Sequence, residues 1–209
     1  MIYVCKFLLR IYLAAAYRLK YEGLKNIPKK TAVIYVSNHR TYADPPLVGA
    51  RARGKLAFMA KEELFKNPLF AWLIRSLGAF PVARGKGDTG VLDTAVERLE
   101  KGHSLMIFPE GTRSKDGKVG RGHSGAAVIA ARSGKMMIPV GIVFGEKLKF
   151  RSKVTVKYGE PIMPQDYVEI SDTPNPRQLV KLKNRYMADI KRLVEGEHES
   201  AAAEEKTDE

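Results

Sequence analysis

The chain has 209 residues, of which 44% are hydrophobic and 28% are charged; this composition is typical of one folded domain and excludes a wholly disordered chain. A single cysteine, Cys5, excludes an intramolecular disulfide and a cysteine-rich zinc site. The net charge of +13 favours an anionic partner, such as a nucleic acid, a membrane surface or an acidic carrier protein.

The first 21 residues predict an amphipathic helix. One narrow stripe at helical spacing is largely basic and aromatic, and most of the remaining circumference is apolar. The stripe consists of Lys6, Arg10, Leu13, Tyr17 and Lys20. The longest uncharged run, residues 11–17, is far too short to span a bilayer. We therefore expect residues 1–21 to lie in the plane of a membrane as an anchor, with the stripe toward the headgroups. Packing on the protein's own core is the alternative.

Beyond this segment, short apolar runs alternate with amphipathic segments. The apolar runs predict strands at residues 31–36, 56–60, 79–82, 105–108, 137–144 and 153–158. The amphipathic segments predict helices at residues 45–51, 62–77, 88–101, 125–133 and 176–194. This order predicts one α/β layered domain over residues 22–194, with a mixed, largely parallel central sheet flanked by helices. Residues 195–209 hold seven acids and one lysine without apolar periodicity, which predicts an acidic disordered tail.

A first motif, Asn38-His39-Arg40-Thr41-Tyr42-Ala43-Asp44, lies where a predicted strand ends and a helix begins. A turn can fold the Asp44 carboxylate back onto the His39 imidazole, which gives half of a proton-transfer relay. Ser37 is expected to face away, and Cys5 lies in the N-terminal helix, so His39 would act directly on a substrate hydroxyl. Taken alone, such a pair is more often a structural hydrogen bond.

A second motif, Phe108-Pro109-Glu110-Gly111-Thr112-Arg113-Ser114, also follows a predicted strand. Gly111 permits a sharp turn, and the three residues after it offer hydroxyl and guanidinium donors that suit phosphate oxygens. An ion pair between Glu110 and Arg113 would explain the same residues structurally. The residues alone leave both interpretations open.

Four blocks in order resemble one enzyme family, the glycerolipid acyltransferases. NHRTYAD resembles the family's NHxxxxD motif, and FPEGTRS matches its glycine–arginine motif almost letter for letter. The other two blocks are GAFPVARG at residues 78–85 and IPVGI at residues 138–142, and YEGLKNIP at residues 21–28 is similar to the usual approach to the first motif. The resemblance spans residues 21–164 and is strongest to the bacterial type of the 1-acyl-sn-glycerol-3-phosphate acyltransferase (lysophosphatidic acid acyltransferase) family.

The resemblance implies a role for each matching residue. His39 looks like the general base on the acceptor hydroxyl and Asp44 like its orienting partner, while Arg84 and Arg113 resemble the arginines that hold the acceptor phosphate. The residues that match the rest of the acceptor site are Glu110, Gly111, Thr112 and Lys61, although Lys61 also fits a solvated lysine at a helix start. Pro139 belongs to the block linked with the acyl donor, or simply packs within a strand.

Two positions depart from the family pattern. Ala83 stands where the family often has an acid, and residues 121–126 lack the lysine that usually precedes a glycine–alanine pair. His123 lies near that position and is interpreted as a surface residue, with replacement of the missing cation as the alternative. These departures bear on the acceptor and the acyl preference rather than on the reaction.

The activity implied is transfer of a fatty acyl group from acyl carrier protein or acyl-coenzyme A to lysophosphatidic acid, giving phosphatidic acid. The sequence holds no ligand cluster that implies a metal, and no cofactor is expected beyond the acyl co-substrate. The amphipathic first 21 residues lead us to expect an enzyme on the cytoplasmic face of the cell membrane, in contact with its anionic surface. Two alternatives remain: the same chemistry on another lysophospholipid or an amino-acid-headed lipid, and a basic nucleic-acid-binding protein. The second is disfavoured because no lysine-interleaved aromatic surface or binding module is evident.

Overall fold

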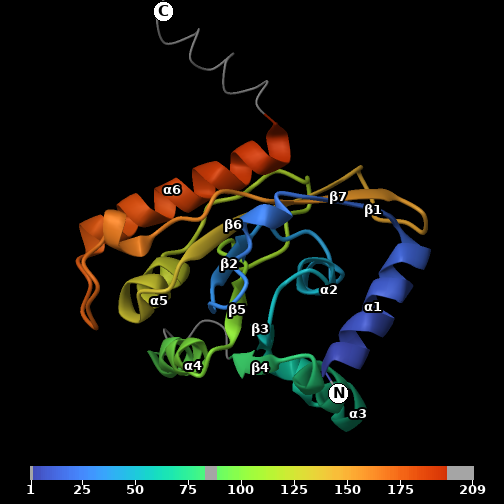
Figure 1. The fold of residues 1–209 in the computed structure, drawn as a ribbon, viewed down its shortest axis with the longest axis horizontal. Helices are drawn as coiled ribbons and strands as arrows, with labels where there is room; N and C mark the ends of the chain where they lie inside the picture. Colours follow the sequence, from blue (N-terminus) through green and yellow to red (C-terminus); the bar gives the residue numbers. More distant parts are fainter. Residues whose placement is uncertain (1, 83–88, 197–209) are drawn as a thin grey trace, which may run out of the picture.

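The computed structural model describes residues 2–82 and 89–196. Within them, seven strands form one sheet in the order β1-β7-β6-β2-β5-β3-β4 (Figure 1). The strands are β1 (Arg18–Glu22), β2 (Ile34–Ser37), β3 (Leu56–Lys61), β4 (Ala79–Val82), β5 (Ser104–Ile107), β6 (Met137–Phe144) and β7 (Lys153–Tyr158). Every neighbouring pair is parallel except β6 and β7. The predicted mixed, largely parallel sheet is confirmed.

Helices cover both faces of this sheet. They are α1 (Ile2–Ala16), α2 (Asp44–Gly49), α3 (Pro68–Ser76), α4 (Thr89–Glu100), α5 (Gly125–Ser133) and α6 (Pro176–Glu195). Ile34 and Val36 of β2 pack with α4, α5 and α6 on one face, whereas Tyr35 between them packs with α1 and α2 on the other (Figure 1). This alternation follows from the two-residue period of a strand, and burial on both faces explains why β2 is apolar throughout.

The single helix predicted over residues 62–77 is wrong. A 3₁₀ turn, Glu62–Phe65, comes first, and α3 begins only at Pro68. The side chain of Asn67 accepts a hydrogen bond from the Phe70 N–H at 3.0 Å, as a helix N-cap does. Proline favours the first helical turn, so Asn67 and Pro68 together start a new helix.

The N-terminal helix also ends earlier than predicted. α1 stops at Ala16, and Arg18–Glu22 form β1, an edge strand parallel to β7. Leu19 and Tyr21 are partly buried against the core, while Arg18 and Lys20 are exposed. This alternation is the signal of a half-buried strand, and the basic helical stripe obscured it.

The orientation of α1 reverses the prediction. Lys6 Nζ donates to the Ala52 carbonyl at 3.0 Å, Arg10 Nε donates to the Ala50 carbonyl at 2.7 Å, and Leu13 is 1% exposed. Burial, and secondarily the Arg10 charge, lower the pKa of Lys6. Lys6, Arg10 and Leu13 of the stripe therefore pack on the domain instead of facing headgroups. The outward residues are apolar: Phe7, Leu8, Ile11 and Tyr12, each more than half exposed. No helix among the described residues is long and apolar enough to cross a bilayer.

The strand order brings both motifs to one edge of the sheet. β2 pairs in parallel with β5, β5 with β3, and β3 with β4, so their carboxyl ends lie at the same edge. Residues 38–44 follow β2, residues 108–114 follow β5, and Lys61 is the last residue of β3. Adjacent strands lie about 4.8 Å apart, so the two motif loops are neighbours.

Candidate active site

The first motif folds around the carboxylate of Asp44. Asp44 Oδ2 lies 2.8 Å from His39 Nδ1 and accepts hydrogen bonds from the Arg40 N–H at 2.6 Å and the Thr41 N–H at 2.8 Å. Its Oδ1 accepts from the Thr41 hydroxyl at 2.8 Å. Ala43 occupies the N-cap position of α2, and Asp44 is the first helical residue. Its fully buried carboxylate turns back to the loop and holds it in one conformation.

This geometry fixes the tautomer of His39. A carboxylate can only accept hydrogen bonds, so Nδ1 is the donor, and in the neutral imidazole Nε2 carries the lone pair. The imidazole stacks on the Phe108 ring, with 4.0 Å between the centroids and 18° between the planes. Its side chain is 14% exposed, and no group within the described part of the chain bonds to Nε2. Nε2 is therefore a free proton acceptor on an oriented ring.

Glu110 joins the two motif loops. Its Oε1 accepts from the His39 N–H at 3.0 Å, and its Oε2 accepts from the Gly120 N–H at 2.9 Å. The Ser114 N–H donates to the His39 carbonyl at 2.8 Å. Glu110 is 8% exposed, and both carboxylate oxygens are used by backbone amides. The alternative of a Glu110–Arg113 ion pair does not form.

Arg113 lies at the exposed tip of the second loop. Its guanidinium sits 4.0 Å from the centroid of the Tyr42 ring, and Nη2 donates to the Tyr42 hydroxyl at 3.2 Å. Tyr42 is 72% exposed, and Thr112 is exposed as well. Gly111 adopts φ +69°, and its N–H donates to the Phe108 carbonyl. The turn at Gly111 thus presents Arg113 beside the first motif with most of its N–H donors open.

Two of the remaining predicted residues have partners outside the two motif loops, and the third lies outside the described residues. Lys61 is exposed and pairs with Glu63 at 2.9 Å. Pro139 is buried in β6 opposite Val36, and its carbonyl accepts from the Gly159 N–H, an arrangement typical of strand packing. Arg84, like Ala83, lies outside the described residues.

His123 is exposed, as interpreted from the sequence. Its ring nevertheless lies beside the second motif, because a Cβ on Gly111 would stand 3.3 Å from His123 Cδ2. Its backbone is held on both sides: the N–H donates to the Pro109 carbonyl, and the carbonyl accepts from the Tyr186 hydroxyl at 3.0 Å. Within residues 2–82 and 89–196, no cluster of three side chains is suited to hold a metal ion.

Sequence reasoning missed two residues that secure the first loop. The Asn38 amide bridges to β6 by donating to the Ile142 carbonyl at 3.0 Å and accepting from the Ile142 N–H at 2.8 Å. Arg40 donates to the Phe144 carbonyl at 2.8 Å and stacks on the Phe144 ring at 4.0 Å. A polar amide directly after a buried strand was the available signal, because such a group needs partners when it is 2% exposed.

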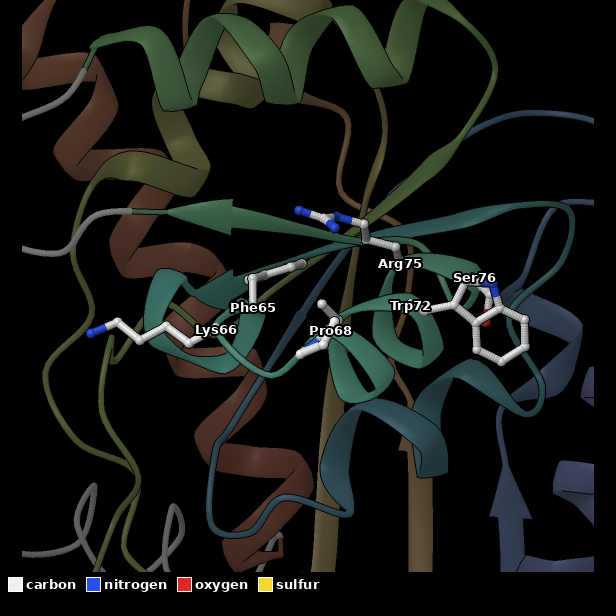
Figure 2. A pocket seen from close by; sticks show the side chains of 7 residues that line it. Phe65, Lys66, Pro68, Trp72, Arg75 and Ser76 are labelled. Atoms are coloured by element: carbon white, nitrogen blue, oxygen red, sulfur yellow. The ribbon is translucent and has the colours of Figure 1, made fainter.

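A cavity of about 510 Å³ opens beside α3, and none of the motif residues lines it. Figure 2 shows its lining side chains, with Lys66 at one end and Trp72 and Ser76 at the other. It is therefore separate from the His39 centre.

The family model described as Acyltransferase matches residues 18–143, which include both motif loops. The chain belongs to the acyltransferase family. It is 33% identical over 145 residues to the chloroplastic 1-acyl-sn-glycerol-3-phosphate acyltransferase LPAT1 of Arabidopsis thaliana, covering 68% of this chain and 40% of that relative. It is 32% identical over 181 residues to the 1-acyl-sn-glycerol-3-phosphate acyltransferase of Streptococcus pneumoniae, covering 84% of this chain and 66% of that one.

A solved structure agrees with the fold. PlsC, the 1-acyl-sn-glycerophosphate acyltransferase of Thermotoga maritima, superposes with a TM-score of 0.76 at 30% identity, covering 93% of this chain and 78% of that one. The chain thus spans between two fifths and two thirds of the two curated relatives' lengths.

Proposed function

We propose that this protein is a 1-acylglycerol-3-phosphate O-acyltransferase. It transfers a fatty acyl group from acyl carrier protein or acyl-coenzyme A to the free hydroxyl of lysophosphatidic acid, and the product is phosphatidic acid. The observation that carries the proposal is the His39–Asp44 pair, in which a buried carboxylate with three further hydrogen bonds holds Nδ1 and leaves Nε2 open. Membership of the acyltransferase family and the names of the relatives support it.

The reaction requires one proton relay. His39 Nε2 accepts the proton of the acceptor hydroxyl while the oxygen bonds to the thioester carbonyl carbon. The tetrahedral intermediate collapses, the carbon–sulfur bond breaks, and the imidazolium returns its proton to the leaving thiolate. Asp44 stabilises the imidazolium and keeps the tautomer correct throughout. No metal and no further cofactor enters this scheme.

The acceptor phosphate is bound at the edge formed by the second loop. Arg113 donates to it in a bidentate manner, assisted by Arg84 after β4 and by Lys61 at the end of β3. Thr112 adds a hydroxyl donor. Glu110 and Gly111 shape the pocket indirectly, because Glu110 holds the His39 backbone and Gly111 makes the turn. On the donor side, Pro139 fixes the strand beneath the acyl thioester.

The enzyme is peripheral on the cytoplasmic face of the cell membrane, with α1 as its anchor. The exposed apolar face of α1 enters the lipid, while Lys6 and Arg10 tie the helix to the domain. Leu8→Glu or Ile11→Glu should each weaken sedimentation with vesicles at least about tenfold, because a buried Leu or Ile contributes about 1.5–3 kcal/mol. Lys6→Gln is the contrasting variant: it should lower the melting temperature and leave vesicle affinity nearly unchanged. If Lys6→Gln weakened vesicle binding and the Leu8 and Ile11 variants did not, the basic stripe would face the headgroups, as the sequence predicted.

The deciding experiment is an acyl-transfer assay in liposomes with a panel of lysolipids and both donors. The panel contains lysophosphatidic acid, a lysophospholipid with a larger headgroup and an amino-acid-headed lysolipid. Phosphatidic acid as the main product, absent with His39→Ala, supports the proposal. Acylation of only another lysolipid would keep the chemistry but replace the acceptor. No transfer to any acceptor by the folded protein would overturn the proposal.

A further inference from the structure

A second cavity, of about 390 Å³, is lined mainly by arginines and tyrosines. Its lining consists of Arg10, Arg18, Arg51, Arg151, Tyr17, Tyr21, Ala14 and Leu19. The four arginines come from four different elements: α1, the first residue of β1, the segment after α2 and the turn before β7. Segments far apart in sequence therefore bring four arginines around one space.

These arginines lack acidic partners. Within residues 2–82 and 89–196, no carboxylate forms an ion pair with any of the four. Arg10 Nε donates to the Ala50 carbonyl at 2.7 Å, and the Arg51 guanidinium lies 4.9 Å from the centroid of the Tyr21 ring. Neither contact neutralises charge. A cavity lined by four positively charged residues without an acidic partner favours an anion.

The backbone at Arg151 adopts an unusual conformation beside the cavity. Arg151 has φ 62° and is the one described non-glycine residue in the left-handed region. Such a conformation costs an L-residue of this type about 1–2 kcal/mol. Its N–H donates to the Ala16 carbonyl at 2.6 Å, which holds the turn against the end of α1. The turn thus keeps an arginine at the cavity in a backbone conformation that glycine or asparagine adopts more readily.

The cavity lies near the catalytic loop but is separate from it. Asp44 begins α2, and Arg51 follows the end of that helix. A rise of 1.5 Å per residue places Arg51 about 10 Å from Asp44 along the chain. Because β1 runs antiparallel to β2, Arg18 and Arg151 lie at the same sheet edge as His39.

We propose that this cavity binds a phosphate group at a site distinct from the acceptor site at Arg113. Guanidinium groups bind phosphate through paired N–H donors, and the cavity offers several of them. The phosphate belongs either to an anionic lipid headgroup or to a soluble donor such as coenzyme A. The lipid source fits the exposed apolar residues alongside: Ile11 and Tyr12 follow Arg10, and Phe150, 78% exposed, precedes Arg151. The proposal concerns binding alone and stands whether or not the chain transfers acyl groups.

The test compares three double variants of the full chain. Arg18→Gln with Arg51→Gln removes two charges from the cavity. Arg18→Lys with Arg51→Lys keeps the charge but removes the planar donors. Arg177→Gln with Lys181→Gln removes two exposed charges from α6, which lies across the molecule from α1 (Figure 1). Binding is measured to coenzyme A, to phosphatidylcholine vesicles, and to phosphatidylcholine vesicles that contain phosphatidylglycerol.

We expect the cavity glutamine pair to lower affinity for coenzyme A or for vesicles that contain phosphatidylglycerol about 30-fold, because each basic residue contributes about 1 kcal/mol at an anionic surface. The lysine pair should lower it about tenfold, and the α6 pair less than about twofold. Neutral vesicles should bind all forms alike. If the cavity variants lose affinity only for the anionic vesicles, the phosphate belongs to a lipid. If they lose affinity for coenzyme A, it belongs to a soluble molecule. A lysine pair that binds like wild type, or a glutamine pair that matches the α6 pair, overturns the proposal.

A second readout uses the wild-type protein and does not depend on how the variants fold. Phenylglyoxal modifies accessible arginines, and mass spectrometry locates the modified residues. Phosphatidylglycerol vesicles or coenzyme A should protect Arg18 and Arg51 and leave Arg177 reactive. Equal reactivity at all three residues in the presence of either probe would contradict a phosphate site in this cavity.

Discussion

The candidate active site has a buried, rigid part and an exposed tip. In the buried part, the side chains of His39, Asp44 and Glu110 are buried or nearly so, and each has defined partners. At the tip, Arg113 and Tyr42 are exposed and contact chiefly each other. Guanidinium has five N–H donors, and the structure uses one of them on Tyr42. The difference matches two tasks: a base must be held in one tautomer, whereas a phosphate-binding group must keep free donors.

The largest expected effect comes from a substitution in the buried part of the site. His39→Ala should lower kcat for acyl transfer about 10²- to 10⁴-fold, because general-base catalysis contributes about that factor. Circular dichroism should remain that of the wild type. His103→Ala is the control, since His103 precedes β5 at the opposite end of that strand from the second motif. A folded His39→Ala protein that keeps most of its activity would remove His39 from the mechanism.

Glu110→Gln tests whether the base is held through the backbone. Glutamine offers one carbonyl oxygen, so either the His39 or the Gly120 N–H would lose its acceptor, at a cost of about 1–3 kcal/mol in unfolding free energy. A displacement of about 1 Å at the imidazole can lower kcat up to 10²-fold. We expect a lower melting temperature and a lower kcat with little change in acceptor KM. The exposed Glu160→Gln provides the control. A raised acceptor KM alone would place Glu110 in direct contact with substrate.

At the tip, Arg113→Lys should raise the KM for lysophosphatidic acid about 5- to 30-fold, because lysine keeps the charge but loses the paired geometry, and with it part of the about 1.5–3 kcal/mol that a charge-assisted hydrogen bond contributes. The donor KM and the melting temperature should stay close to wild type. Steady-state kinetics with each substrate varied separately makes the comparison. An unchanged acceptor KM would mean that Arg113 has no part in phosphate binding.

Tyr42→Phe should have the smallest effect. The change removes the hydroxyl that accepts from Arg113 but keeps the aromatic ring beneath the guanidinium. Because both groups are exposed, we expect less than about a threefold rise in acceptor KM. Tyr42→Ala, which also removes the ring, should raise the KM further. Equal effects of both substitutions would show that the ring does not position Arg113.

The sequence predicted the sheet because its strands are buried on both faces and are therefore continuous apolar runs, as in β2 and β6. It predicted the positions of His39 and Arg113 because turn residues follow such runs directly. Amphipathicity also separated Lys6, Arg10 and Leu13 from the exposed apolar side of α1. It could not tell which side faces the domain, since the acceptors of Lys6 and Arg10 are carbonyls at residues 50 and 52.

The partners of Glu110 were beyond sequence reasoning for a related reason. His39 is 71 residues away, and its backbone N–H has no sequence signature. Because of its charge, Arg113, which lies three residues after Glu110, was the expected partner. The buried Glu110 carboxylate instead accepts hydrogen bonds from backbone N–H groups, which also need partners when they are buried. Local spacing thus identified the chemical groups, whereas tertiary contacts decided which ones are held and which stay open.

A double-mutant cycle on His39 and Asp44 tests the central claim most directly. The kcat for acyl transfer to lysophosphatidic acid is measured for His39→Ala, Asp44→Asn and the double variant, each checked for native circular dichroism. If Asp44 acts only through the imidazole, the double variant is no slower than His39→Ala alone, because residues that act as a unit are not additive. Losses that multiply in the double variant would contradict the account, since Asp44 would then contribute independently of His39.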